Sequence, residues 1–264
     1  MRIRVSSRML VFLCLLQAGC GGSAGSQGGE GPGGREQSLA LKGKEELELG
    51  RRAYAEALKP YRGKVLPADA APVRRARAVL ERLVGAAEIE ILQREMNLRT
   101  RGYRFEWELA VVRDRQVNAF CVPGGKMAVF TGMLDMTGDD DDFLATVLSH
   151  EMAHALAHHA SERLARERSG DGFLGGLSYG RMQEEEADHM GVFLMAFAGF
   201  DARKAPAFWA RMRQAHGGGG GGLAEIFSSH PSNESRVRAL ASQAPRATAA
   251  KKRFDQLKAA RSGR

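Results

Sequence analysis

The stretch that most restricts what this chain can become is residues 141–165, DDFLATVLSHEMAHALAHHASERLA. Its apolar residues recur at helical spacing and aspartates crowd its start, so the sequence predicts one helix here. Within it, His150-Glu151-Met152-Ala153-His154 is an HExxH motif. Residues four apart share one face of a helix, so His150 and His154 can present two imidazoles to a single ion. Glu151 beside them is free to act as a base rather than as a ligand.

The alternative interpretation is a pair of core histidines whose ring nitrogens are satisfied by hydrogen bonds. That leaves unexplained why Glu151 shares the buried face, because charged groups are rarely buried unless they are paired or bound to a metal. The HExxHxxGxxH pattern of metzincins is excluded, since Ala157 and Ala160 occupy the glycine and third histidine places. The other histidines predicted not to bind the metal are His158, His159, His189 and His216.

A second helix is predicted from about residue 181 to 198, and it carries an acidic run. A run of charges is usually a solvated face. Here Glu184 and Asp188 are four residues apart, and Val192 and Met195 continue their face, so the acidic face merges into an apolar one. That pattern suits Glu184 as a third zinc ligand. Asp188 would accept a hydrogen bond from the far nitrogen of a ligating histidine.

Strands are expected before the motif. Residues 103–112 alternate enough for a strand, and residues 117–132 are predicted as a strand, a Pro-Gly-Gly turn and a second strand. Such a hairpin either offers an edge for an extended peptide to join or is purely structural. Cys121 on this hairpin is expected to be a small buried thiol rather than a nucleophile, because no histidine or basic residue is adjacent to it.

Helices account for most of the remaining chain. Amphipathic or apolar-faced segments predict them at 39–59, 72–94 and 201–215, followed by a basic final helix that ends near residue 260. The glycine-rich segment 169–180 is expected to break the helical run, either as a mobile flap over the site or as a long connection. The fold class predicted from these elements is α+β and mainly helical.

Residues 1–20, MRIRVSSRMLVFLCLLQAGC, indicate a secretory signal, because a basic start is followed by an apolar run and small residues. The apolar run is far shorter than the ~20 residues of a membrane-spanning helix. The ending Gln17-Ala18-Gly19-Cys20 resembles a bacterial lipobox, although Gln17 stands where leucine is usual. We therefore expect Cys20 to be lipidated. Ordinary cleavage near Cys20 is the alternative, and it would leave a Cys20–Cys121 bridge possible.

Residues 21–38 are rich in glycine and serine and are expected to form a tether, followed by one domain over 39–260. Gly21, rather than aspartate, follows Cys20, which by resemblance to bacterial lipoprotein sorting signals implies the periplasmic side of the outer membrane. A soluble periplasmic or secreted protein is the alternative. Loss of the signal arginines takes the formal charge from +8 to +5. No nucleic-acid-binding motif accompanies that charge, so no nucleic-acid partner is expected.

Four stretches together resemble the zinc metallopeptidases of peptidase family M48: NAFCVPGG at 118–125, HEMAH at 150–154, EEEAD at 184–188 and SSHPSNESR at 228–236. The resemblance spans roughly residues 40–243. That family includes HtpX, the CAAX prenyl endopeptidase and BepA. The chain most resembles the short periplasmic, lipoprotein-type members, because the sequence predicts neither membrane-spanning helices nor tetratricopeptide repeats.

The resemblance implies a zincin-like metallopeptidase domain with one Zn²⁺ per chain. It implies His150, His154 and Glu184 as the metal ligands, Glu151 as the catalytic carboxylate and His230 as a residue near the metal. In BepA-like members such a histidine can occupy the fourth zinc position and keep the enzyme latent. The six-glycine run at 217–222, just before His230 in this chain, lies outside the family pattern.

The expected function is therefore that of a zinc endopeptidase. Glu151 would take a proton from a water molecule that zinc has made more acidic and pass it to the leaving amine. His230 and Tyr179 are candidates to stabilise the oxyanion. Misfolded or unassembled envelope proteins are the expected substrates. The rival is a non-catalytic periplasmic chaperone or assembly factor with a structural zinc site, in which Glu151 would have no role.

Overall fold

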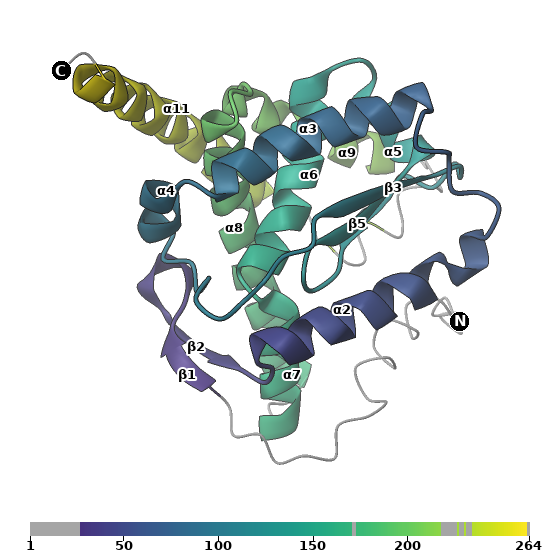
Figure 1. The fold of residues 1–264 in the computed structure, drawn as a ribbon, viewed down its shortest axis with the longest axis horizontal. Helices are drawn as coiled ribbons and strands as arrows, with labels where there is room; N and C mark the ends of the chain where they lie inside the picture. Colours follow the sequence, from purple (N-terminus) through teal and green to yellow (C-terminus); the bar gives the residue numbers. More distant parts are fainter. Residues whose placement is uncertain (1–26, 171–172, 218–225, 227–229, 231–233, 263–264) are drawn as a thin grey trace.

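A three-stranded sheet lies at the centre of the protein, and helices cover both of its faces (Figure 1). The structure is a computed structural model and describes residues 27–170, 173–217, 226, 230 and 234–262. The strand order is β3 (Glu108–Val112), β5 (Lys126–Phe130), β4 (Ala119–Cys121), with β3 parallel and β4 antiparallel to β5. The hairpin expected over 117–132 is confirmed. Its turn places Gly124 and Gly125 at φ of 81° and 97°, where a side chain would be strained.

The two faces of β5 contact different helices, because successive side chains of a strand point to opposite sides. Met127 and Val129 join the main core, to which α3 (Ala71–Ala87) and α6 (Asp141–Leu156) contribute. Ala128 and Phe130 instead pack with α2 (Gly43–Leu58), whose Tyr54 hydroxyl donates a hydrogen bond of 3.1 Å to the carbonyl of Met127. Burial on both faces explains why β5 lacks the alternation of a half-exposed strand.

The helix α6 runs through the middle of the molecule (Figure 1). It packs against α3, the β4 strand, α8 (Phe173–Phe197) and α9 (Ala205–Gly217), and α11 (Glu234–Ser262) covers α8 and α9. Every residue from Leu144 to Leu156 is buried. The Asp140 carboxylate accepts hydrogen bonds from the backbone N–H groups of Asp142 and Phe143, which caps the helix as its acidic start predicted. Its polar residues are therefore held in the interior of the protein.

Short elements complete the chain between these helices: η2 (Lys59–Tyr61), α4 (Glu90–Glu95), α5 (Thr131–Thr137) and η3 (Ala202–Lys204). None of the described helices combines the length and the apolar character that crossing a bilayer requires. The predicted α+β, mainly helical, zincin-like class is confirmed.

The single helix predicted over 141–165 is wrong beyond residue 156. The chain breaks at Ala157 and His158 and restarts as α7 (His159–Ser169). His158 adopts a left-handed backbone with φ of 54°. Tertiary contacts hold it there, since its Nδ1 lies 3.0 Å from Oε1 of Glu46 and its Nε2 lies 3.0 Å from the carbonyl oxygen of Arg99. These partners are distant in sequence, so helical periodicity gave no sign of the break.

The helix α8 begins at Phe173, not near residue 181, so the expectation of a flap or connection is wrong for residues 173–180. Glycine costs about 1 kcal/mol in a helix interior relative to alanine. The chain stays helical across Gly175, Gly176 and Gly180 despite that cost, and α8 packs against α6 and α11.

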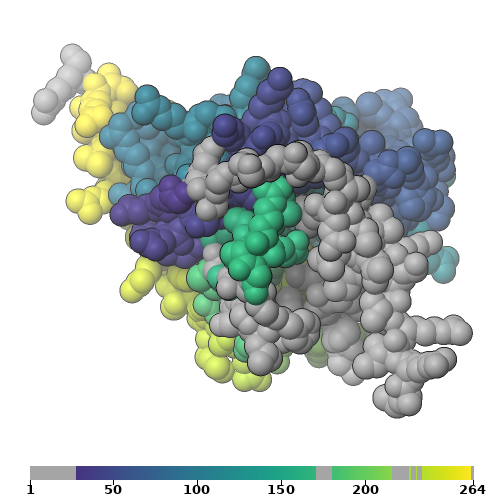
Figure 2. Space-filling model, turned by 90° about the horizontal axis from the view of Figure 1, so that it is seen from below, coloured from purple at the N-terminus to yellow at the C-terminus, as the bar shows by residue number. Residues whose placement is uncertain are grey.

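The expected tether is also wrong for residues 27–38, which form a hairpin joined to the domain. Its strands are β1 (Gln27–Glu30) and β2 (Glu36–Leu39), linked by η1 (Pro32–Gly34). The side chain of Gln37 is buried and donates a 2.7 Å hydrogen bond to the carbonyl of Ala157. This hairpin, in purple, and α7, in green, are visible on one face in Figure 2. The glycine-rich composition suggested a tether because composition does not report contacts between residues far apart in the sequence, such as that of Gln37 with Ala157. Residues 1–20, with Cys20, lie outside the described residues.

Candidate metal centre

Four buried side chains converge where α6, α8 and the segment before α11 meet. α6 supplies His150 and His154, α8 supplies Glu184, and His230 completes the group. The Nε2 atoms of the two α6 histidines are 3.2 Å apart, and each lies 3.3 Å from a carboxylate oxygen of Glu184. His230 Nδ1 lies 3.2 Å from His150 Nε2 and 3.0 Å from Glu184 Oε2.

These separations fit a metal ion. Zinc binds imidazole nitrogen and carboxylate oxygen at about 2.0–2.2 Å in tetrahedral sites, which places its ligand atoms about 3.3–3.5 Å apart. Three imidazoles and one carboxylate suit zinc better than calcium or magnesium, which prefer oxygen ligands. The structure thus brings together His150, His154 and Glu184, and it places His230, which the family resemblance implied near the metal, among the same donors.

The surroundings of the donors shift their pKa values in different directions. Burial opposes the charge on Glu184, but interactions with the surrounding imidazoles of His230, His154 and His150 outweigh burial and hold the pKa of Glu184 well below its usual value. Burial lowers the pKa of His154 well below its usual value. Burial also acts to lower the pKa of His150, but contacts with Asp188 and Glu184 raise it to about 9. Because a metal-binding imidazole must be free of a proton on the ligating nitrogen, metal binding would release that proton.

Glu151 lies beside this donor group without belonging to it. Its Oε1 is 3.4 Å from His230 Nε2, and its Oε2 accepts a 3.2 Å hydrogen bond from the backbone N–H of Cys121 in β4. The Cys121 thiol is not activated, because burial and the nearby charge of Glu151 raise its pKa well above the usual value. The carboxylate is therefore held between the donor group and the outer strand of the sheet.

Asp188 lies behind His150, on the side of the ring that faces away from the metal donors. Its Oδ1 lies 3.1 Å from His150 Nδ1, although the ring N–H is poorly aligned for a hydrogen bond. The guanidinium of Arg236 makes two hydrogen bonds to Asp188, of 2.7 and 2.9 Å, and its Nη1 lies 3.1 Å from Glu184. Arg236 was missed by sequence reasoning, although it ends the SSHPSNESR stretch. Its buried cation holds Asp188 and a metal donor in place together.

Glycine makes this close packing possible at one position. A Cβ atom on Gly191 of α8 would lie 3.2 Å from Ser149 Oγ and 3.4 Å from the backbone nitrogen of His150. A side chain there would require Ser149 Oγ, next to the ligand His150, to shift by a few tenths of an ångström.

The rear of His154 is occupied by His159, a residue predicted only as a non-ligand. The two Nδ1 atoms are 2.8 Å apart, and His159 Nε2 lies 3.0 Å from Oε2 of Glu186. Burial lowers the pKa of His159, and contact with Glu186 opposes that effect. His158 and His189 lie outside the donor group. The side chains of Tyr179 and His216 are outside the described residues. The sequence gave no sign of the His154–His159 contact, because it depends on the break before α7.

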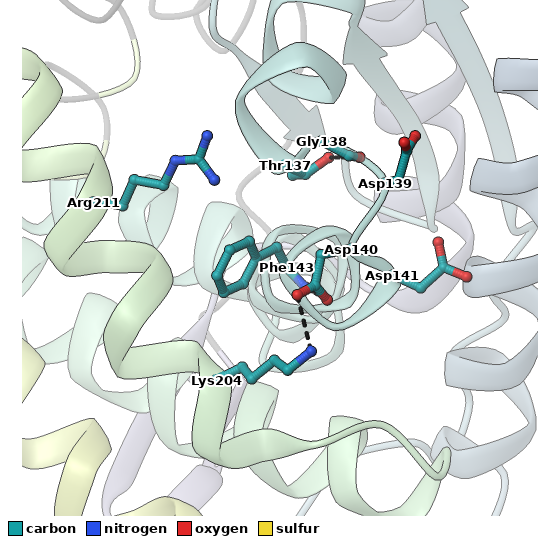
Figure 3. A pocket seen from close by; sticks show the side chains of 8 residues that line it. All are labelled: Thr137, Gly138, Asp139, Asp140, Asp141, Phe143, Lys204 and Arg211. Carbon is teal, nitrogen blue, oxygen red and sulfur yellow. Dashed lines mark hydrogen bonds and ion pairs between the residues drawn. The ribbon is translucent and has the colours of Figure 1, made fainter.

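A hollow of about 590 Å³ lies at the start of α6, and none of the metal donors lines it (Figure 3). Two of its three aspartates are paired, since Lys204 Nζ lies 2.9 Å from Asp140 Oδ2 and Arg75 Nε lies 2.7 Å from Asp141 Oδ1. His150 is nine residues beyond Asp141, about 13 Å along the helix. At the start of α6, Asp140 therefore caps the helix and binds Lys204, and Asp141 binds Arg75.

The chain matches the model of peptidase family M48 over residues 86–171 and 169–244. The chain belongs to peptidase family M48. This confirms the resemblance seen in the motifs, and because the family is zinc-dependent it identifies the expected ion as Zn²⁺. The four donors include the three that the family motifs imply.

Relatives of two kinds are similar to this M48 chain. "Mitochondrial metalloendopeptidase OMA1" of Schizosaccharomyces pombe is 34% identical over 225 residues, which is 76% of this chain and 62% of the relative. Human "Metalloendopeptidase OMA1, mitochondrial" is 31% identical over 179 residues, 54% of this chain and 33% of the relative. A "Putative beta-barrel assembly-enhancing protease" of Vibrio cholerae is 28% identical over 133 residues, 39% of this chain and 27% of the relative. The chain thus spans less than two thirds of the length of these relatives.

Proposed function

We propose that this protein is a zinc-dependent endopeptidase. The observation that carries the proposal is the position of Glu151, a carboxylate 3.4 Å from His230 and outside the metal donors. A zinc site that only stabilises a fold needs no such base. Glu151 therefore favours a peptidase over the rival, a non-catalytic chaperone or assembly factor with a structural zinc ion.

The chain's own residues have distinct parts in this proposal. His150, His154 and Glu184 would hold the zinc ion, which lowers the pKa of water and polarises a carbonyl group when bound. Glu151 would accept the proton of the attacking water and deliver it to the leaving amine. The hydrogen bond from Cys121 N–H orients Glu151 for this transfer. Oxyanion stabilisation through His230 Nε2, which lies 3.4 Å from Glu151, is the alternative to the latent role argued for His230 below.

A protein substrate is favoured by the sheet edge beside Glu151. β4 pairs with β5 on one side and is one of the two outer strands of the described three-stranded sheet. An extended peptide could add to it through main-chain hydrogen bonds, which would bring a peptide bond beside the metal donors. Misfolded or unassembled envelope proteins are the proposed substrates, and the signal-like start and the name of the Vibrio cholerae relative support them.

The proposal predicts that the mature protein degrades casein, that a zinc chelator stops degradation, and that added zinc restores it. Released peptides, measured by mass spectrometry, separate endopeptidase products from trimming at chain ends. Casein left intact by zinc-loaded protein, under conditions that also displace His230, would favour the chaperone instead.

His230 is proposed to keep the enzyme latent as the fourth metal donor. Its Nδ1 lies within 3.0–3.2 Å of Glu184 and His150, at the separation of neighbouring ligands. With His230 in that position no water could be activated there. Since ~1.4 kcal/mol corresponds to a tenfold population ratio, a modest preference for the closed state keeps most molecules inactive.

The variant His230→Ala is therefore expected to raise basal casein degradation, by about tenfold for such a preference. Initial rates at equal zinc content provide the measurement. Reduced activity would instead assign His230 to oxyanion stabilisation. Unchanged activity and unchanged zinc content would remove His230 from the site.

We propose that Cys20 is lipidated and anchors the protein to the periplasmic side of the outer membrane, on the basis of the Gln17-Ala18-Gly19-Cys20 ending. Cys20→Ser is expected to move the protein from the membrane fraction to the soluble fraction, as measured by fractionation and immunoblotting. Wild-type protein found wholly in the soluble fraction would support the alternative, a soluble periplasmic or secreted protein.

A further inference from the structure

We propose that the N-terminal hairpin, β1–β2, positions the metal ligand His154 through the chain Arg35–Glu186–His159. Arg35 lies between β1 and β2, next to η1, and none of these three residues belongs to the metal donors. The inference rests on the metal site of the proposed function and adds positioning residues to it.

The orientation of each group in this chain follows from the metal donor. His154 presents Nε2 to the donor group, so a neutral ring carries its proton on Nδ1. That proton points at His159 Nδ1, 2.8 Å away, which must then be the acceptor. His159 in turn carries its proton on Nε2 and donates to Glu186 Oε2 at 3.0 Å. A carboxylate at the end of the chain thus fixes the tautomer of both imidazoles.

Arg35 fixes that carboxylate. Its Nε and Nη2 contact the two oxygens of Glu186 at 2.5 and 2.7 Å, and its other side pairs with both oxygens of Glu162 on α7. The side chain of Glu162 is 1% exposed and that of Glu186 is 14% exposed. Without the guanidinium the two carboxylates would repel each other in a poorly hydrated place. Glu186 would then leave the position from which it orients His159.

This role is separable from docking of the hairpin itself. The Gln37 side chain is bonded to the Ala157 carbonyl, and the backbone N–H of Leu41 donates to Ser161 Oγ at 3.0 Å. Leu39 is fully buried. These contacts do not involve the Arg35 side chain, so the hairpin is expected to stay attached when Arg35 is replaced, while the Glu186 carboxylate is released.

The test is the zinc affinity of the full mature chain, measured by competition with a chromophoric chelator. Arg35→Ala and Glu186→Ala are each expected to weaken zinc binding about 10-fold or more, as loss of a partner behind a ligand does. Because both act through one chain, the double variant should be little weaker than Glu186→Ala alone. Arg51→Ala is the matched control. It removes another bidentate arginine–glutamate pair, Arg51 with Glu106, and should leave zinc affinity unchanged.

Arg35→Lys keeps the positive charge but cannot contact both carboxylates as the guanidinium does, so it should weaken zinc binding less than Arg35→Ala. If Arg35→Ala does not fold, the zinc affinity of Arg35→Lys provides the test. Zinc affinities of the folded Arg35 and Glu186 variants that equal that of Arg51→Ala would overturn the inference. Additive losses in the double variant would overturn it as well. Wild-type protein that binds no zinc would instead refute the proposed function.

Discussion

Glu151→Gln is expected to lower kcat/KM for casein by about 10²–10⁴-fold while zinc stays bound. The amide matches the carboxylate in shape and can still accept the hydrogen bond from Cys121 N–H, but it cannot take up a proton at neutral pH. The four donors are untouched, so zinc content should remain one ion per chain. Initial rates and metal analysis of the same preparation measure both quantities.

The matched control is Glu162→Gln. It makes the same chemical change in a buried carboxylate that lies outside the donor group and contacts Arg35. Any loss of activity in that control should disappear at saturating zinc, whereas the loss in Glu151→Gln should persist. Wild-type turnover by zinc-loaded Glu151→Gln protein would show that another group is the base.

Glu184→Ala is expected to abolish stable zinc binding, with an affinity loss beyond the ~10–100-fold that follows removal of a partner behind a ligand. It removes the carboxylate that lies 3.3 Å from the Nε2 atoms of both α6 histidines. It also leaves the buried cation of Arg236 with one fewer partner. Zinc content after dialysis and competition with a chelator measure the loss.

The neighbouring acids supply the comparison. Glu185 is exposed, so Glu185→Ala should retain zinc like the wild type. Glu186 differs from Glu185 because its Oε2 lies 3.0 Å from His159 Nε2, behind the ligand His154, so Glu186→Ala should also weaken zinc binding. A gradation is therefore expected, with the largest loss at Glu184, a smaller one at Glu186 and none at Glu185. Zinc loss centred on Glu185 would show that the register of α8 is wrong.

The parts of the site that could be predicted from sequence are those set by spacing within one helix. His150 and His154 share a face of α6, and Glu184 and Asp188 share a face of α8, because residues four apart on any helix do so. The hairpin of β4 and β5 could also be predicted, because its signal is local: a turn sequence between two apolar runs.

The remaining features depend on contacts between residues far apart in the chain. Arg35 reaches α7 and α8 across 127 and 151 residues, and Glu46 holds His158 across 112. Neither pairing leaves a periodic trace in the sequence. A glycine-rich composition pointed to a tether at 21–38, yet a few buried side chains, Gln37 and Leu39 among them, fix residues 27–38 to the domain.

The contact between His154 and His159 requires a spacing of five residues with a left-handed residue, His158, between α6 and α7. On an uninterrupted helix, residues five apart are rotated by about 140° and face away from each other. The turn at His158, with φ of 54°, brings His159 back against the ring of His154. A residue inserted or deleted at this turn would separate the two imidazoles while leaving the HExxH motif intact. An HExxHxxxxH spacing in a sequence can therefore signify two short helices meeting at a corner, with the last histidine supporting a ligand from behind.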